Sequence, residues 1–316
     1  YTNTPELAAE MADVVRLFYG EIALGVNRGR EGADLCLEHS LSREGGVWRC
    51  AFSLKARTLR REAPVPREGP LVYKRLRKRL CKQALYDLLK AETGTHPPWG
   101  SLTGIRPTRL VYEAMARGAG PARAAEEVGE TFDLHRDKAE LLGRIVKTQL
   151  TLPPPRPLEA DVYIGIPFCT TRCAYCSFAS GDIGDGRRVG PYVRALLQEM
   201  AFTAALMAEK GLSPRAVYMG GGTPTALPAP ELRQVLGAMA RHFPSAREYT
   251  VEAGRPDSIT REKLENIREA GVGRICINPQ SMRGETLERI GRGHTPEETL
   301  AAYALSREAG FASVNM

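Results

Sequence analysis

Three cysteines stand close together in the stretch VYIGIPFCTTRCAYCSF, residues 162–178. Cys169 and Cys173 are separated by three residues, and Cys173 and Cys176 by two. Such short gaps let three thiolates converge on one metal centre. The run before them, residues 161–166, has the apolar character of a buried strand. We therefore expect the three thiols on a loop at the end of a strand, where they could bind a metal.

Three cysteines at this spacing are compatible with more than one kind of site. A structural zinc site takes four ligands, but the next histidine downstream is His242 and the next cysteine is Cys276. A redox dithiol is less favoured because Cys173 and Cys176 lack thioredoxin-like surroundings, and unligated core cysteines are not expected so close together. The residues favour a [4Fe–4S] cluster held by three cysteines. One iron would then stay open for a chelating small molecule.

The composition indicates which class of protein carries these cysteines. The chain has 316 residues, of which 43% are hydrophobic and 26% are charged, which is typical of a soluble globular protein with about two domains. The other four of its seven cysteines are scattered, which argues against a disulfide framework and favours a reducing cytoplasm. We expect no membrane span and no secretory signal. The net charge of +7 is compatible with anionic ligands.

A proline-rich stretch, residues 153–160, divides the chain. Clustered prolines cannot continue a helix and favour an extended spacer, so we interpret the stretch as a linker. Before it we expect a smaller α+β domain over residues 1–152. Its predicted elements are a helix at 7–19, a hairpin of strands 33–41 and 47–54, and helices at 71–93, 108–117, 121–130 and 134–150.

Two neighbouring parts of this first domain are basic. The run YKRLRKRLCK, residues 73–82, lies in a segment with apolar residues at every fourth position, which predicts an amphipathic helix with a solvated basic face. Aromatic residues are nearly absent from it, so a nucleic-acid surface is not expected. The following loop, GTHPPWGSLTGIRPTRL, contains Trp99, Arg106 and Arg109. These three could line a site for an anionic group, and a structural loop is the alternative.

Residues 161–316 alternate strictly between strands and helices. The predicted strands are 161–166, 216–219, 249–253, 274–278 and 312–315; the predicted helices are 192–210, 229–242, 261–270 and 296–309, with a short piece near Glu285. This alternation predicts a parallel sheet, in which ligands gather at the carboxyl ends of the strands. The cysteine loop, the glycines 220–222, Glu252 and Gln280 all fall at these ends.

The motifs at the strand ends resemble a known family. CTTRCAYC has the spacing of radical S-adenosylmethionine (radical SAM) enzymes. YIGIPFCTTRCAYCSF, YMGGGTPTAL, TVEAGRPDSIT and INPQSMRGETLERIGRGHTPEET resemble successive blocks of the oxygen-independent coproporphyrinogen III oxidase family. SLTGIRPTRL and EAGRPD are similar to its coproporphyrinogen dehydrogenase branch, HemZ. The resemblance covers nearly the whole chain. It implies that residues 161–316 form part of a parallel (β/α)6-type radical SAM barrel that stops before its last strand.

The resemblance also implies roles for individual residues. Cys169, Cys173 and Cys176 would bind a [4Fe–4S] cluster, and the open iron would chelate the methionine part of S-adenosylmethionine. His294 is interpreted as a structural histidine. The positions that match cofactor-binding residues of the family are Tyr163 and Tyr175 beside the cluster, Gly221, Gly222 and Thr223 in the loop that holds the methionine end, the acid Glu252, and Gln280 and Arg292 at a second cofactor or substrate position.

The family implies a radical SAM oxidoreductase that converts propionate side chains of coproporphyrinogen III to vinyl groups, with an electron donor such as flavodoxin or ferredoxin. True oxidases of the family commonly carry a fourth cysteine where this chain has Phe178. The same departure occurs in haem chaperones of the family. A haem chaperone, and a radical SAM methyltransferase or haem-opening enzyme, are therefore the alternatives.

Overall fold

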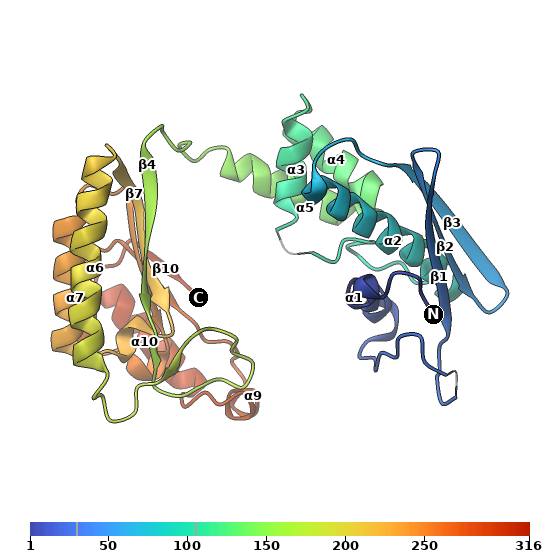
Figure 1. The fold of residues 1–316 in the computed structure, drawn as a ribbon. Helices are drawn as coiled ribbons and strands as arrows, with labels where there is room; N and C mark the ends of the chain where they lie inside the picture. The colour runs from blue at the N-terminus through green and yellow to red at the C-terminus, as the bar shows by residue number, and fades with distance from the viewer. Residues whose placement is uncertain (30, 105) are drawn as a thin grey trace. The chain divides into compact units, whose positions relative to one another are not determined.

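The computed structural model describes residues 1–29, 31–104 and 106–316. The chain divides into two compact units, Tyr1–Pro154 and Pro155–Met316 (Figure 1). Each unit has hydrophobic cores of its own. The division falls inside the proline-rich stretch, of which the last two residues already belong to a strand.

The first unit opens with helices packed on an antiparallel sheet of three strands in the order β1-β2-β3 (Figure 1). Trp48 and Phe52, on the central strand, are buried together with Leu85 and Leu89 of the long helix α2. The elements are the 3-10 helix η1 (Pro5–Leu7), α1 (Ala8–Tyr19), β1 (Leu37–Glu44), β2 (Val47–Leu54), β3 (Arg57–Pro64) and α2 (Pro70–Thr93).

The third strand was missing from the prediction, and the first lies a few residues later than predicted. β3 has the sequence RTLRREAP, in which charged residues hide the period-two pattern. It is an edge strand, and charges on an edge strand discourage pairing with other chains. The prediction of a solvated basic face on α2 was only half right. Lys74 and Arg75 are exposed, but Arg77 and Lys78 are half-buried and pair with Glu6 and Glu10.

Three further helices complete the first unit, as predicted. They are α3 (Thr108–Met115), α4 (Pro121–Phe132) and α5 (Arg136–Gln149). Their core includes Val111, Val128 and Leu142. The preceding loop meets the end of α4 at Gly100, which has a φ of +52° and where an added Cβ would lie 2.0 Å from the carbonyl oxygen of Phe132. Only glycine fits this close approach.

The second unit is a parallel sheet of five strands in the order β10-β9-β8-β7-β4. Consecutive strands are neighbours, as in a (β/α) barrel, and helices such as α6 and α7 cover one face (Figure 1). The strands are β4 (Glu159–Ile166), β7 (Ser213–Gly221), β8 (Glu248–Gly254), β9 (Arg274–Ile277) and β10 (Ser313–Asn315). The helices are α6 (Val189–Glu209), α7 (Ala229–His242), α8 (Arg261–Glu269), α9 (Gly284–Arg289) and α10 (Pro296–Glu308). The α/β fold with a parallel sheet is therefore confirmed.

The two faces of this sheet differ in chemistry. Ile164, Val217 and Val251 are buried in the core with the helices. Alternate residues on the same strands, such as Tyr163, Tyr218 and Glu252, carry polar atoms and stay partly or largely exposed. Because successive side chains on a strand point to opposite faces, the sheet presents a polar face away from its helices.

Candidate metal centre and cofactor site

The three cysteines lie on the loop that follows β4. Cys169 ends the two-residue strand β5 (Phe168–Cys169), which pairs with β6 (Gly181–Asp182). This short sheet was not predicted. Its register fixes the first cysteine, and the carbonyl oxygen of Cys169 accepts a hydrogen bond of 2.9 Å from the backbone N–H of Ile183. The N–H of Cys176 donates to the carbonyl oxygen of Cys173 over 3.1 Å, which makes a tight turn. All three thiols are free and partly buried.

A buried arginine ties the cysteine loop to the end of β8. Arg255 is 2% exposed, and its Nη1 donates to the carbonyl oxygen and the hydroxyl of Thr171. Asp257 accepts from Arg255 at 3.1 Å and from Thr170 at 3.0 Å. The Thr171 hydroxyl in turn donates to the carbonyl oxygen of Gly291 at 2.8 Å. The loop is therefore anchored from two sides, through residues 255–257 and through residue 291.

The glycines at the end of β7 lie directly against the first cysteine. The N–H groups of Gly222 and Thr223 donate to the carbonyl oxygens of Ile166 and Phe168, each over 2.7 Å. The Thr223 hydroxyl lies 3.7 Å from the Cys169 sulfur. A Cβ at position 222 would lie 2.9 Å from that sulfur. Glycine is required here because any side chain would occupy the space beside the thiol. Gly220 and Gly221 belong to β7 itself rather than following it.

Tyr163, Tyr218 and Glu252 converge on the polar face of the sheet. The two tyrosine rings are stacked, with centroids 5.9 Å apart. The Tyr218 hydroxyl donates to Oε1 of Glu252 over 2.5 Å. Burial, and then the Glu252 carboxylate, raise the pKa of Tyr163 and of Tyr218. Both tyrosines thus stay neutral and can act as hydrogen-bond donors at neutral pH.

A glycine keeps the space between these side chains open. A Cβ on Gly220 would lie 2.9 Å from Oε2 of Glu252 and 3.1 Å from the Tyr163 hydroxyl. The second carboxylate oxygen of Glu252 therefore borders the space above Gly220. Sequence reasoning singled out Glu252, Tyr163 and the glycines 220–222 but missed Tyr218. The signal was available, because residue 218 alternates with the buried Val217 and Met219 on the same strand.

The remaining predicted residues lie beyond the end of β9. Arg292 donates to the carbonyl oxygen of Asn278 at 3.2 Å and to the Tyr175 hydroxyl at 3.5 Å. Its Nε is buried without a partner among the residues that the structure describes. Gln280 is exposed and has a φ of +62°. His294 is 4% exposed, lies 3.4 Å from the carbonyl oxygen of Pro279, and has a pKa that burial lowers.

The donor set fits an iron–sulfur cluster. Three thiols on one loop are soft ligands, and the glycine at position 222 leaves room beside Cys169. The structure also gathers cysteines that sequence reasoning counted as scattered. In the first unit, His39, Cys50 and Cys81 are buried, and their ligand atoms lie within 4.8 Å of one another among the described residues.

Comparison with known proteins decides the family. Residues 163–316 match the radical SAM superfamily. These residues belong to the radical SAM superfamily. Radical SAM proteins carry a [4Fe–4S] cluster and use S-adenosylmethionine, so both cofactors follow from membership. The cysteine motif and the polar face of the sheet lie within the matched region.

Two curated relatives and one solved structure show how far the similarity extends. The oxygen-independent coproporphyrinogen-III oxidase-like protein HemZ of Bacillus subtilis is 37% identical over 97% of this radical SAM chain and 63% of its own length. The heme chaperone HemW of Bacillus subtilis is 36% identical over 49% of this chain and 41% of its own. Coproporphyrinogen III oxidase (HemN) from Escherichia coli has 24% identity and a TM-score of 0.46, covering 58% of this chain and 40% of its own.

The radical SAM chain thus spans less than two thirds of the length of each of these proteins. Across the described residues, no helix is both long and apolar enough to cross a membrane.

Proposed function

We propose that the protein is a radical SAM oxidoreductase that decarboxylates propionate side chains of coproporphyrinogen III. The observation that carries the proposal is the convergence of three kinds of group at one edge of the sheet. These are the thiols of the cysteine loop, the glycine loop that touches Cys169, and Glu252 with its two tyrosines. The HemZ relative, whose name contains coproporphyrinogen-III oxidase, supports the substrate because its similarity includes the first unit.

In this proposal Cys169, Cys173 and Cys176 hold the cluster. Once bound, the cluster and S-adenosylmethionine supply a carbon radical that can remove a hydrogen atom from the substrate. Arg255 and Thr171 hold the loop in place so that the three sulfurs keep one arrangement. A fixed arrangement of ligands lowers the entropic cost of assembling the site.

The residues on the sheet would bind and orient S-adenosylmethionine. Gly221 and Gly222 let the backbone approach the methionine end closely. Glu252, fixed by Tyr218, offers Oε2 as an acceptor at the space above Gly220. Charge-assisted hydrogen bonds of this kind are stronger than neutral ones. Arg292, whose buried Nε has no partner among the described residues, would add a donor from the segment that follows β9.

The test is an anaerobic assay with coproporphyrinogen III, S-adenosylmethionine, a flavodoxin or ferredoxin as electron donor, and a one-electron acceptor. For each propionate, the substrate loses one hydrogen atom, CO2 and one further electron, and a vinyl group remains. We expect 5′-deoxyadenosine, methionine and CO2 to form in equal amounts. Deoxyadenosine without CO2 in the presence of the acceptor would refute the oxidase while leaving radical SAM chemistry in place.

A haem chaperone is the second candidate, and one observation favours it. Phe178, two residues after the last cysteine, is 63% exposed and carries no thiol, so the described loop offers three sulfur ligands rather than four. HemW relatives, which are named heme chaperones, are 33–36% identical over 49% of the chain. If the protein is a chaperone, it should bind haem tightly, and CO2 should not appear with any tetrapyrrole.

A further inference from the structure

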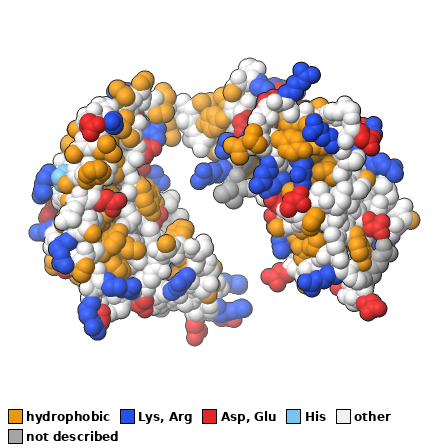
Figure 2. Space-filling model, in the orientation of Figure 1, with side chains coloured by type: hydrophobic (Ala, Val, Ile, Leu, Met, Phe, Trp, Pro, Cys, Tyr) orange, Lys and Arg blue, Asp and Glu red, His pale blue; other side chains and the backbone are white. Residues whose placement is uncertain are grey.

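The first unit contains a basic pocket, separate from the cysteine loop. It has a volume of about 350 Å³ and lies between helix α2, the loop before α3, and α3 itself. On the face of the first unit that Figure 2 shows, Lys and Arg side chains lie among hydrophobic ones. The cationic side chains that line the pocket are Arg75, Lys78, Arg79, Lys82, Arg106 and Arg109.

Among the lining residues that the structure describes, these cations outnumber the acidic side chains. The two acidic side chains in the lining are Glu10 and Glu113. Glu113 lies 2.9 Å from Arg75 and 3.4 Å from Arg109, and Glu10 pairs with Lys78. In the part of the chain that the structure describes, no carboxylate lies within 4.0 Å of a charged nitrogen of Arg79, Lys82 or Arg106. The pocket therefore keeps an excess of positive charge.

Two of the unpaired cations are taken partly out of water. Burial lowers the pKa of Arg79, and the neighbouring Arg75 lowers it further, against an opposing effect of Glu113. Burial likewise lowers the pKa of Lys82 and outweighs the opposing effect of Asp13 and Glu10. Removing a cation from water without a counter-ion costs free energy. Both cations line one pocket, so an anion bound there would offset part of this cost.

The rest of the lining suits an anion that has an apolar body. The Arg79 guanidinium lies over the Phe132 ring, 4.9 Å from its centroid, and Leu102 and Leu110 also line the pocket. The Thr103 hydroxyl is buried and has no hydrogen-bond partner among the described residues. Arg106 has a φ of +61°, a conformation that a non-glycine residue keeps only where the surroundings enforce it. Apolar walls combined with convergent polar groups are the usual composition of a small-molecule site.

We propose that this pocket binds the carboxylate side chains of the tetrapyrrole substrate. The identity of the ligand rests on the proposed function, whereas the excess of cations is a property of the pocket itself. A tetrapyrrole with propionate groups has a flat apolar ring and several carboxylates, which matches the apolar and cationic parts of the lining. Arg79, Lys82 and Arg106 are the residues that would pair with these carboxylates.

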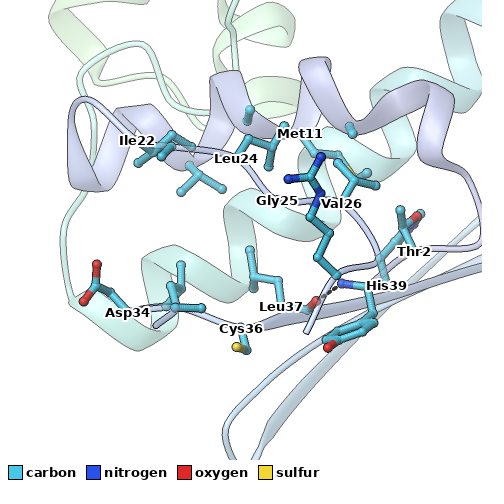
Figure 3. Close-up of a pocket in the computed structure, with 18 of the residues that line it drawn as sticks. Thr2, Met11, Ile22, Leu24, Gly25, Val26, Asp34, Cys36, Leu37 and His39 are labelled. Atoms are coloured by element: carbon cyan, nitrogen blue, oxygen red, sulfur yellow. Dashed lines mark hydrogen bonds between the residues drawn. The ribbon is translucent and has the colours of Figure 1, made fainter. Parts of the chain in front are cut away.

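The larger cavity of the same unit is a poorer match for a polyanion. Its volume is about 580 Å³, and it lies between α1, the segment that follows α1, and β1. Figure 3 shows Met11, Ile22, Leu24 and Val26 around it. Of its lining residues that the structure describes, Arg28 is the one lysine or arginine, and Glu21 and Asp34 are acidic. A ligand with several carboxylates would meet more repulsion there than in the basic pocket.

The test measures binding of coproporphyrin III, the stable oxidised form with four carboxylates, to the whole chain by fluorescence. The double variant Arg79→Gln/Lys82→Gln is compared with Arg136→Gln/Lys147→Gln, which removes the same charge from exposed positions of the same unit. We expect the first double variant to weaken binding by about tenfold or more, since one lost ion pair of ~1.4 kcal/mol already has that effect. The control should stay close to wild type. The tetramethyl ester, which has the same ring without charge, should bind poorly to all forms.

Equal affinity of the wild type and the Arg79→Gln/Lys82→Gln variant would overturn the proposal, and so would equal binding of the acid and the ester. Strong binding of inorganic phosphate without binding of coproporphyrin would overturn the ligand class. Thermal unfolding provides a check, because loss of two unpaired cations should not destabilise the unit. CO2 release is measured separately. If the wild type releases CO2 but the Arg79→Gln/Lys82→Gln variant binds coproporphyrin as tightly as the wild type, this inference alone fails. If coproporphyrin binding depends on Arg79 and Lys82 but no CO2 is released, the proposed function alone fails.

Discussion

A single nitrogen of Arg255 holds Thr171 by two groups, donating to its carbonyl oxygen at 2.9 Å and to its hydroxyl at 2.7 Å. Thr171 lies midway between the first two cysteines, and Arg255 lies just after β8. The contact thus joins the cysteine loop to the strand that carries Glu252. One buried charge therefore helps to fix the cysteine loop relative to the strand of Glu252.

Replacing Arg255 should therefore loosen the cysteine loop. In Arg255→Gln the buried guanidinium loses its hydrogen bonds to Thr171 and Asp257, and the free energy of unfolding should fall by about 1–3 kcal/mol. Iron should leave the reconstituted protein faster in the presence of a chelator. Arg261→Gln, which removes an exposed arginine paired with Glu308, is the control and should resemble wild type. Unchanged iron release in Arg255→Gln would show that the contact does not position the thiols.

Substitution of Gly222 should damage the site through a steric overlap. In Gly222→Ala the new Cβ would lie 2.6 Å from the carbonyl oxygen of Phe168 and 2.9 Å from the Cys169 sulfur. We expect a loss of about 1–3 kcal/mol in stability, together with weaker S-adenosylmethionine binding by calorimetry. Gly237→Ala is the matched control, because nothing lies within 4 Å of an added Cβ there. It lies in α7 and should stabilise by up to about 1 kcal/mol. If Gly222→Ala and Gly237→Ala have the same stability and the same affinity for S-adenosylmethionine, Gly222 is not part of the cofactor site.

The Tyr218–Glu252 contact predicts a graded effect on cofactor affinity. Glu252→Gln should weaken S-adenosylmethionine binding by about tenfold, as expected for loss of a charge-assisted hydrogen bond. Tyr218→Phe should have a smaller effect, because it removes only the group that orients Glu252. Tyr249→Phe removes a hydroxyl that donates to the Phe243 carbonyl oxygen. It should lower stability without changing affinity. If Glu252→Gln binds the cofactor as tightly as wild type, Glu252 is not a cofactor ligand.

Asp133 should make the stability of the first unit dependent on pH. Burial alone would raise the pKa of Asp133, but hydrogen bonds from Lys90 at 2.5 Å and Tyr86 at 2.7 Å outweigh it and lower that pKa below its ordinary value. A depressed carboxyl pKa gives stability that is present above about pH 4 and is lost as the pH falls through the folded-state value.

Asp133→Asn should therefore cost about 1 kcal/mol at pH 7, a modest figure because the side chain is 43% exposed. The difference from wild type should shrink as the pH falls below about 4 in urea titrations. Asp34→Asn, at an exposed position of the same unit, should show little effect at any pH. A constant difference between wild type and Asp133→Asn from pH 3 to 7 would contradict the predicted linkage.

The apolar periods of the helices and strands predicted most of the architecture. The helices of both units and the strands of the parallel sheet have strong apolar periods, because each buries one face. β3 was missed because an edge strand keeps polar residues on both faces. β5 and β6 were missed because two-residue strands have no period to detect. The cysteine spacing predicted a metal site because Cys169, Cys173 and Cys176 lie within eight residues of each other.

Residues that act across the fold were harder to find. Arg255 lies in the quoted block EAGRPD, yet its role depends on Thr171, which is 84 residues away in the sequence. The basic pocket joins the charged helix α2 to the SLTGIRPTRL loop. The sequence suggested each part as a separate feature, but only the folded chain shows that Arg79, Lys82 and Arg106 line one space.

The iron content of the cysteine variants after anaerobic reconstitution tests most directly whether the cysteine loop binds a [4Fe–4S] cluster. Wild type should bind about four irons per chain, and Cys169→Ala, Cys173→Ala and Cys176→Ala should each lose most of this iron and its brown absorbance. Cys36→Ala and Cys276→Ala should retain it. Zinc is measured in the same samples, with Cys50→Ala included because Cys50 lies in the His39–Cys50–Cys81 group. Wild-type iron in all three loop variants, or stoichiometric zinc lost only from those variants, would contradict the assignment of the cysteine loop to a [4Fe–4S] cluster.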